Sequence, residues 1–214
     1  MEVLTEKILK LAQELPEGGS LCAKALLHLG GRAAVDQALS RLVRRGRLLR
    51  AGRGVYVRLL KGRFGTRPPA AAMLVRTIGQ QRGETVAIHG AAAANTLGLT
   101  TQVPAHEIYL TSGRTRRLKL GAQVVEMRHA PSWQLLMPER PAGNAVRALA
   151  WLGPKHAAEA LRTLRRKLSK TEVREMVGVR GRLPTWMAQE VSAFFNDACG
   201  YHDPGAMTGR TLLR

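Results

Sequence analysis

Cysteine is nearly absent from this 214-residue sequence, which has only Cys22 and Cys199. The two residues are far apart, and neither belongs to a CxxC or HxxxH pattern of the kind that holds zinc. This usage is typical of a protein in the reducing cytosol and predicts no disulfide framework and no metal site. We interpret both cysteines as small apolar core residues.

Long apolar runs are missing as well. No stretch approaches the roughly 20 apolar residues that a membrane-spanning helix needs. The opening residues, MEVLTEKILKLAQELPEGGS, lack the apolar segment of a secretory signal. We therefore expect a cytoplasmic protein without a membrane partner.

Catalytic groups are sparse. The 15 acidic residues are scattered, with no DxD or HExxH pattern, no GxSxG elbow and no glycine-rich phosphate loop. His89 could serve as a base after a strand, and Thr111–Gly113 could hold a nucleophile, but both are more typical of structural turns. The sequence therefore predicts a protein that is not an enzyme and that uses no cofactor.

Positive charge is abundant. There are 34 Lys and Arg residues, the formal net charge is +19, and the pI is near 11.4. Between Arg32 and Arg63, ten basic residues accompany a single acid, Asp36. Such an excess favours polyanionic partners, nucleic acid before anionic membrane.

The first 60 residues predict a winged helix-turn-helix. Apolar residues at three- and four-residue steps predict a helix that Pro16 ends, a second over about 21–29 capped by Ser20, and a third over 32–45 that Gly46 ends. Two short strands, 48–50 and 55–57, flank a hairpin turn at 51–54. Three helices followed by a hairpin is the order of that DNA-binding unit.

The basic residues of this unit are left on its outside. On the third helix, Gln37 and Arg41 are four residues apart and could read an adenine and a guanine edge, although Arg41 could instead hold a phosphate. Arg53, at the hairpin tip, would reach a minor groove or a phosphate. The full set of predicted DNA-binding residues is Arg32, Gln37, Arg41, Arg44, Arg45, Arg50 and Arg53. A solvated helix face, or a winged helix that binds protein, is the alternative.

Residues 61–200 predict a second, mixed and mostly helical domain, so the expected fold class is mainly α with small β elements (α+β). Residues 59–67 are interpreted as a basic linker, and 201–214 as a flexible tail. A helix should end at Gly83, strands should cover 85–88, 107–111 and 122–128, and later helices should begin with Asn144 as a cap, at Pro154, after Ser169 and at Pro184.

Two further basic clusters lie in this second part. Arg114, Arg116, Arg117 and Lys119 occupy the expected connection between two strands, and Arg162, Arg165 and Arg166 lie on the outside of a helix. Each cluster could extend the DNA surface, bind a partner protein, or simply form a solvated face.

Three stretches resemble the AbiEi-type antitoxins of abortive-infection, type IV toxin–antitoxin systems. These are AVDQALSRLVRRGRLLRAGRGVYV, TVAIHGAAAANTLGL and EIYLTSGRTRRLKLG, and the resemblance covers most of residues 1–198. It implies phage defence by a protein that represses its own operon through upstream inverted repeats in double-stranded DNA. It also implies a nucleotidyltransferase-type toxin as partner.

Two alternatives stay open at the level of sequence. One is a stand-alone winged-helix transcriptional regulator without a toxin partner. The other is an enzyme that acts on nucleic acid, against which the missing acidic cluster argues.

Overall fold

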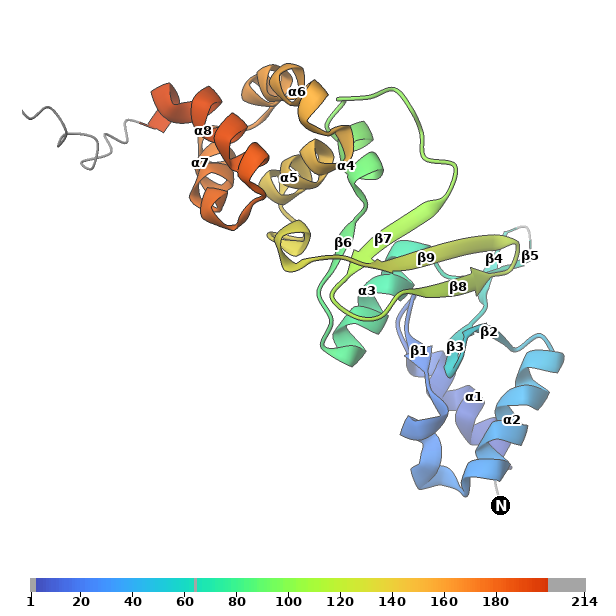
Figure 1. The fold of residues 1–214 in the computed structure, drawn as a ribbon. Coiled ribbons are helices and arrows are strands. Elements are labelled where there is room, and N and C mark those ends of the chain that lie inside the picture. Colours follow the sequence, from blue (N-terminus) through green and yellow to red (C-terminus); the bar gives the residue numbers. More distant parts are fainter. Residues whose placement is uncertain (1–2, 64, 200–214) are drawn as a thin grey trace, which may run out of the picture.

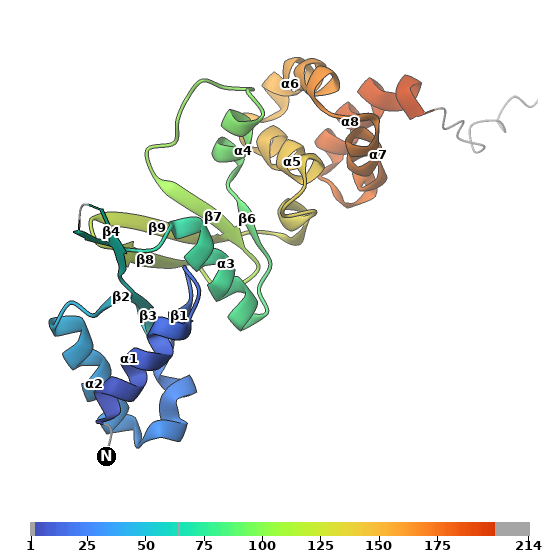
Figure 2. The ribbon, with the colours of Figure 1, turned by 180° about the vertical axis from the view of Figure 1, so that it is seen from behind.

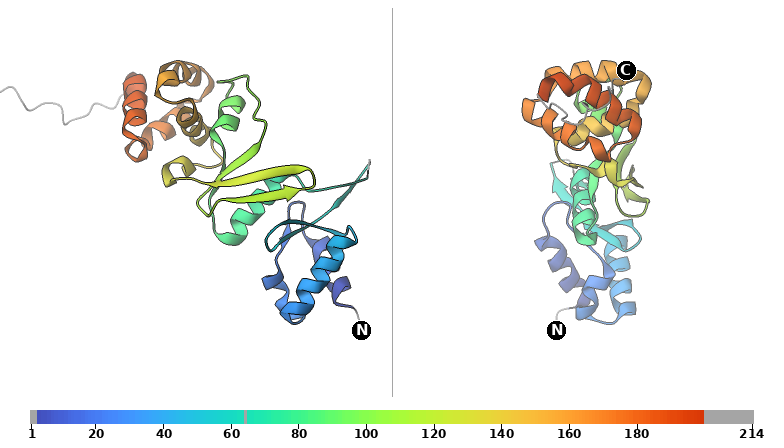
Figure 3. Two further views of the ribbon diagram at one scale, coloured as in Figure 1. Left: turned by 45° about the vertical axis from the view of Figure 1, so that its right-hand side comes forward. Right: turned by 60° about the vertical axis from the view of Figure 1, so that its left-hand side comes forward.

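The computed structural model describes residues 3–63 and 65–199, and it shows a mixed α+β fold (Figure 1). A helical N-terminal part, a central sheet and a C-terminal group of helices follow one another along the long dimension of the molecule (Figures 1 and 3). The expected flexible tail at 201–214 lies outside the described residues.

The N-terminal part has the expected order of helices and hairpin. Its elements are α1 (Leu4–Glu14), β1 (Ser20–Leu21), the 3-10 helix η1 (Ala23–Leu29), α2 (Arg32–Arg44), β2 (Leu48–Gly52) and β3 (Val55–Arg58). Ile8, Leu26, Val35, Leu39 and Leu42 form its core. Strands β1, β3 and β2 pair in that order into one antiparallel sheet.

The predicted second helix is partly wrong. Ser20 does not cap it, because Ser20 pairs with Val57 in the sheet and exchanges hydrogen bonds of 2.8 and 3.0 Å with Gln81. The following segment is a 3-10 helix that begins at Ala23. Cys22, expected in the core, is only partly buried, and the side chain of Cys199 lies outside the described residues.

Residues 59–67 are not a linker. They contain an antiparallel hairpin of β4 (Leu60–Gly62) and β5 (Gly65–Arg67). The glycine at position 65 has φ +110°, a backbone conformation that only glycine adopts readily. Helix α3 (Ala71–Arg82) follows and ends at Gly83, as predicted.

The central sheet has four strands in the order β6, β7, β9, β8. They are β6 (Val86–Ile88), β7 (Glu107–Thr111), β8 (Arg116–Leu120) and β9 (Gln123–His129), and α4 (Gly90–Thr96) leaves the sheet after β6. Strand β7 pairs in parallel with β9, and β8 pairs antiparallel with it. The basic stretch that was expected to be a connection is therefore itself mostly a strand.

One face of the sheet is covered by α3 and by the β2–β3 hairpin, as Figure 2 shows from behind. Val55 and Val57 share a core there with Ile78 of α3 and Leu118 of β8. A methyl group added to Gly52 would lie 3.3 Å from Leu118 Cδ2, so β2 and β8 approach closely. The division into two domains at residue 60 stays a prediction. The core just described contains residues from both sides of that position.

The C-terminal part is helical. It contains η2 (Ser132–Leu135), α5 (Pro141–Leu152), α6 (Pro154–Lys167), α7 (Lys170–Gly178), η3 (Arg180–Arg182) and α8 (Thr185–Cys199). The capping box of Ser169 and Glu172 at the start of α7 is confirmed. Asn144 is not a cap, because Pro141 begins α5 one turn earlier and Arg140 takes the cap position.

None of the helices in the described ranges combines the length and apolar character needed to cross a bilayer.

Candidate nucleic-acid interface

Helix α2 presents a basic, solvent-exposed face. Its buried residues, among them Leu39 and Leu42, fix the opposite side in the N-terminal core. Gln37, Arg41 and Arg44 are exposed, and none of their side chains forms a hydrogen bond or ion pair with another described residue. These three side chains are therefore available to a ligand.

The single acid of this segment is already paired. Arg32 Nε donates to Asp36 Oδ2 at 2.8 Å, and this partner raises the pKa of Arg32. The pair is exposed, so it contributes little to stability. Because Arg32 neutralises Asp36, the one carboxylate of α2 does not repel a phosphate.

The β2–β3 hairpin carries two predicted residues, Arg50 and Arg53. Gly52 pairs with Val55, so the turn consists of Arg53 and Gly54, and Gly54 has φ +71°. Arg53 is exposed at this turn, and Arg50 is exposed on β2. The hairpin thus projects charge beside α2.

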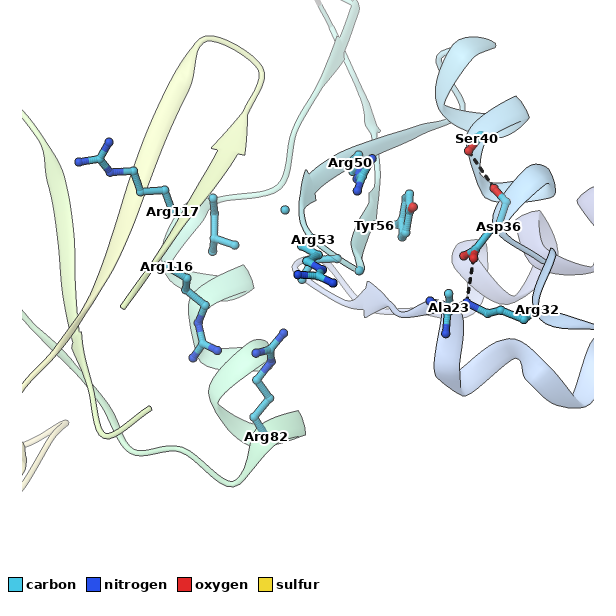
Figure 4. A pocket seen from close by; sticks show the side chains of 14 residues that line it. Ala23, Arg32, Asp36, Ser40, Arg50, Arg53, Tyr56, Arg82, Arg116 and Arg117 are labelled. Atoms are coloured by element: carbon cyan, nitrogen blue, oxygen red, sulfur yellow. Dashed lines mark hydrogen bonds and ion pairs between the residues drawn. The ribbon is translucent and has the colours of Figure 1, made fainter. Parts of the chain in front are cut away.

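A hollow of about 710 Å³ lies between α2, the hairpin, the end of α3 and β8. We call it the basic groove, and Figure 4 shows its lining side chains. It is lined by one acid, Asp36, and by six arginines, namely Arg32, Arg50, Arg53, Arg82, Arg116 and Arg117. The groove therefore joins residues of the N-terminal part to residues beyond position 80.

Three of these arginines line the groove from three different elements. Arg82 at the end of α3 and Arg116 on β8 extend toward each other (Figure 4), and Arg53 lines the same groove from the hairpin turn. We call Arg53, Arg82 and Arg116 the arginine triad. Burial, and secondly the charge of Arg82, lower the pKa of Arg116.

Arg116 is held in place from behind by a carboxylate. Its Nη2 forms an ion pair with Glu84, and both side chains are about five-sixths buried. Thr111, which is fully buried, donates its hydroxyl to Glu84 at 3.0 Å, and the Gly113 amide donates to the same hydroxyl at 3.0 Å. This chain of contacts orients the Arg116 guanidinium toward the groove.

The two basic clusters of the second part lie in different places in the structure. Within the first, Arg116 faces the groove, whereas the Arg117 side chain points away from it (Figure 4). Lys119 follows Arg117 on the exposed side of β8, because Leu118 and Leu120 face the core. Arg114 is exposed in the turn before β8. The second cluster, Arg162, Arg165 and Arg166, lies exposed on α6 at the far end of the molecule (Figure 1).

Sequence reasoning missed Arg82 and Glu84. Arg82 is a single basic residue in the last turn of a helix, and Glu84 follows the Gly83 that ends it. No spacing pattern marks either residue, because Arg82 reaches the groove, and Glu84 reaches Arg116, through the packing of α3 against the sheet.

Metal-ligating side chains are not clustered among the described residues. No group of three or more His, Cys, Asp or Glu residues in these ranges could hold a metal ion. His89 has a structural role, because its Nδ1 accepts a hydrogen bond of 3.2 Å from the Ala91 amide at the start of α4.

Comparisons with known proteins give one family and one solved structure. A family model described as "Family of unknown function (DUF6088)" matches residues 7–177. No curated protein matches the chain. The crystal structure of the RV2827C protein from Mycobacterium tuberculosis is similar with a TM-score of 0.49 and 15% sequence identity, over 92% of this chain and 77% of that chain.

Proposed function

Because the chain belongs to the DUF6088 family, whose description gives no function, we propose a function from its own surface. The protein is a winged helix-turn-helix protein that binds double-stranded DNA in a sequence-specific manner. In this proposal α2 is the recognition helix and the β2–β3 hairpin is the wing.

The basic groove is the observation that supports this proposal most strongly. Arginines of α2, the hairpin, α3 and β8 line one hollow, and its only acid is neutralised by Arg32. Guanidinium groups bind phosphate in a bidentate manner, and phosphate contacts supply most of the affinity of a DNA-binding protein. A surface of this kind attracts a nucleic-acid backbone.

Sequence readout falls on the exposed face of α2. Gln37 and Arg41 are one helical turn apart, and both are exposed without partners among the described residues. A glutamine can hydrogen-bond an adenine edge and an arginine a guanine edge in the major groove. Arg44, Arg45 and Arg50 then serve the flanking phosphates.

The resemblance to AbiEi-type antitoxins extends the proposal. The protein then represses its own operon through upstream inverted repeats, and its second part neutralises a nucleotidyltransferase-type toxin. The support for this extension is the similarity of residues 34–57, 85–99 and 107–121. A nucleotidyltransferase-like reading frame directly downstream favours the antitoxin, and its absence favours the stand-alone regulator.

Substitution of Arg41 tests the readout. Arg41→Ala should cost about 1–3 kcal/mol of binding free energy on the native upstream duplex and relax the preference at one base pair. The measurement is fluorescence anisotropy on that duplex and on single-base variants. Arg166→Ala, which removes one exposed arginine of α6, is the matched control. Equal affinities of the two variants would show that α2 does not read the DNA.

A further inference from the structure

We propose that the second part of the chain belongs to the DNA interface, because the arginine triad binds phosphates of the same duplex that α2 contacts. The inference rests on the proposed function and gives two residues of the basic groove, Arg82 and Arg116, a specific role as phosphate ligands. Both lie outside the proposed winged helix-turn-helix.

The three positive charges of the triad are only partly balanced by negative charge. Glu84 compensates Arg116, whereas the side chains of Arg53 and Arg82 form no hydrogen bond or ion pair with any residue in the ranges 3–63 and 65–199. Two positive charges therefore remain uncompensated in one hollow. Burial, and secondly the charge of Arg82, lower the pKa of Arg116, so the two guanidinium groups are close enough to repel each other. An arrangement that costs free energy in the unbound protein is relieved when an anion binds between the groups.

The chemistry of the triad fits a phosphate backbone. Each guanidinium offers a planar set of N–H donors that matches two phosphate oxygens. The net charge of two that remains after Glu84 is counted would neutralise two phosphodiesters. The groove continues from the triad to Arg32 and Ser40 of α2. A single DNA strand can therefore follow it from the proposed recognition helix to β8.

One member of the triad, Arg116, is also preorganised. Gly52 lies against Leu118, and Val55 and Val57 share a core with Leu118, so the hairpin turn and β8 are held at a fixed spacing. Glu84 is paired with Arg116 and accepts a hydrogen bond from Thr111. Little side-chain entropy of Arg116 is therefore lost when the ligand binds, which favours affinity.

Helix α6 supplies a matched control. Arg162 and Arg166 are exposed on α6, at the far end of the molecule from the groove (Figure 1). We compare the double variant Arg82→Ala/Arg116→Ala with the double variant Arg162→Ala/Arg166→Ala. Both lose two positive charges, so the general electrostatic attraction of the protein changes equally.

The test is fluorescence anisotropy of the full chain on its own upstream duplex and on a shuffled duplex, each titrated across salt. The groove variant should bind both duplexes at least about tenfold more weakly, because its two missing arginines no longer form charge-assisted hydrogen bonds to phosphate. The slope of its log affinity against log salt concentration should become shallower by about two units. The control variant should keep a slope within about one unit of the parent, because its charges contact no phosphate.

Each outcome decides the matter. Equal effects of the two double variants, or an unchanged salt slope in the groove variant, would overturn the inference while the parent still binds its own duplex specifically. A parent that shows no preference for its own duplex would instead overturn the proposed function. Because loss of Arg116 leaves Glu84 unpaired, circular dichroism must show that the variants are folded. Arg82→Ala alone, which breaks no ion pair, should still lower the slope by about one unit.

Discussion

Arg147 is the one charged side chain that is fully buried among the described residues, with 1% of its surface exposed. It contacts no carboxylate. Instead, its guanidinium donates to the main-chain oxygens of Gln134, Leu136 and Pro138 and to Asn144 Oδ1. Burial lowers its pKa to about 10, so the group remains charged at neutral pH. The segment before α5 is therefore held to that helix by one side chain.

Substitution of Arg147 by methionine should strongly destabilise the protein. Arg147→Met leaves three main-chain carbonyl oxygens and Asn144 Oδ1 without their donor, and each such loss costs about 1–3 kcal/mol. We expect a loss of about 3 kcal/mol or more in the free energy of unfolding by urea. Arg166→Met, on the exposed side of α6, should change it by no more than about 0.5 kcal/mol. A similar small effect for both variants would show that Arg147 does not hold this segment.

His89 makes stability depend on pH. Its half-buried ring accepts a hydrogen bond from the Ala91 amide and must be neutral at Nδ1 to do so. Burial, and secondly the charge of Arg128, lower its pKa below 6.5, against an opposing effect of Glu126. The unfolded chain thus binds the proton more readily than the folded one, so the stabilisation is present above pH 6.5 and is lost as pH falls through the lower folded pKa.

His89→Asn separates the cap from the titration. Asparagine is also a good cap but does not ionise. Thermal unfolding should show similar stability of variant and parent near about pH 8, and a smaller loss for the variant near about pH 5. Equal losses on acidification would show that His89 does not contribute to the acid sensitivity.

At the scale of elements, the packing of α4 on α5 depends on a glycine. A methyl group added to Gly90 would lie 2.6 Å from Trp151 Cβ and would collide with the main-chain oxygen of Arg147. A backbone oxygen inside a helix cannot move aside cheaply. Gly90→Ala should therefore lower the free energy of unfolding by about 1–3 kcal/mol.

Gly178 at the end of α7 provides the comparison, since a methyl group there meets nothing within 4 Å. Gly178→Ala should leave stability unchanged or raise it by up to about 1 kcal/mol. Urea unfolding measures both variants. If Gly90→Ala proved as harmless as Gly178→Ala, the close approach of α4 and α5 would be wrong.

Elements with strong local signals were predictable from the sequence. The apolar stripe of α2, the glycine that ends α3 and the capping box of α7 were identified correctly. Strand β1 was missed because its partner is distant in the sequence, with Ser20 opposite Val57. Strand β8 pairs with the next strand, with Leu118 opposite Val125, and was missed because its basic residues were interpreted as a connection. Short polar strands of this kind carry little information of their own.

At the scale of the whole molecule, the candidate site was only half predictable. Arg32, Arg50 and Arg53 were recognised from their positions on one helix and one hairpin, and they do line one groove. Arg82 joins them because α3 packs beside β8, which no local pattern reveals. Arg116 and Arg117 looked equivalent in sequence, and strand alternation places them on opposite faces.

The most direct test of the central claim is the salt-dependent affinity of the parent protein for its own upstream DNA and for a shuffled duplex of equal length. Specific binding predicts a preference of about 10³-fold or more for the native duplex, together with a steep negative salt slope on both. Equal affinity for the two duplexes would contradict the claim and leave only a basic protein that binds polyanions without selection.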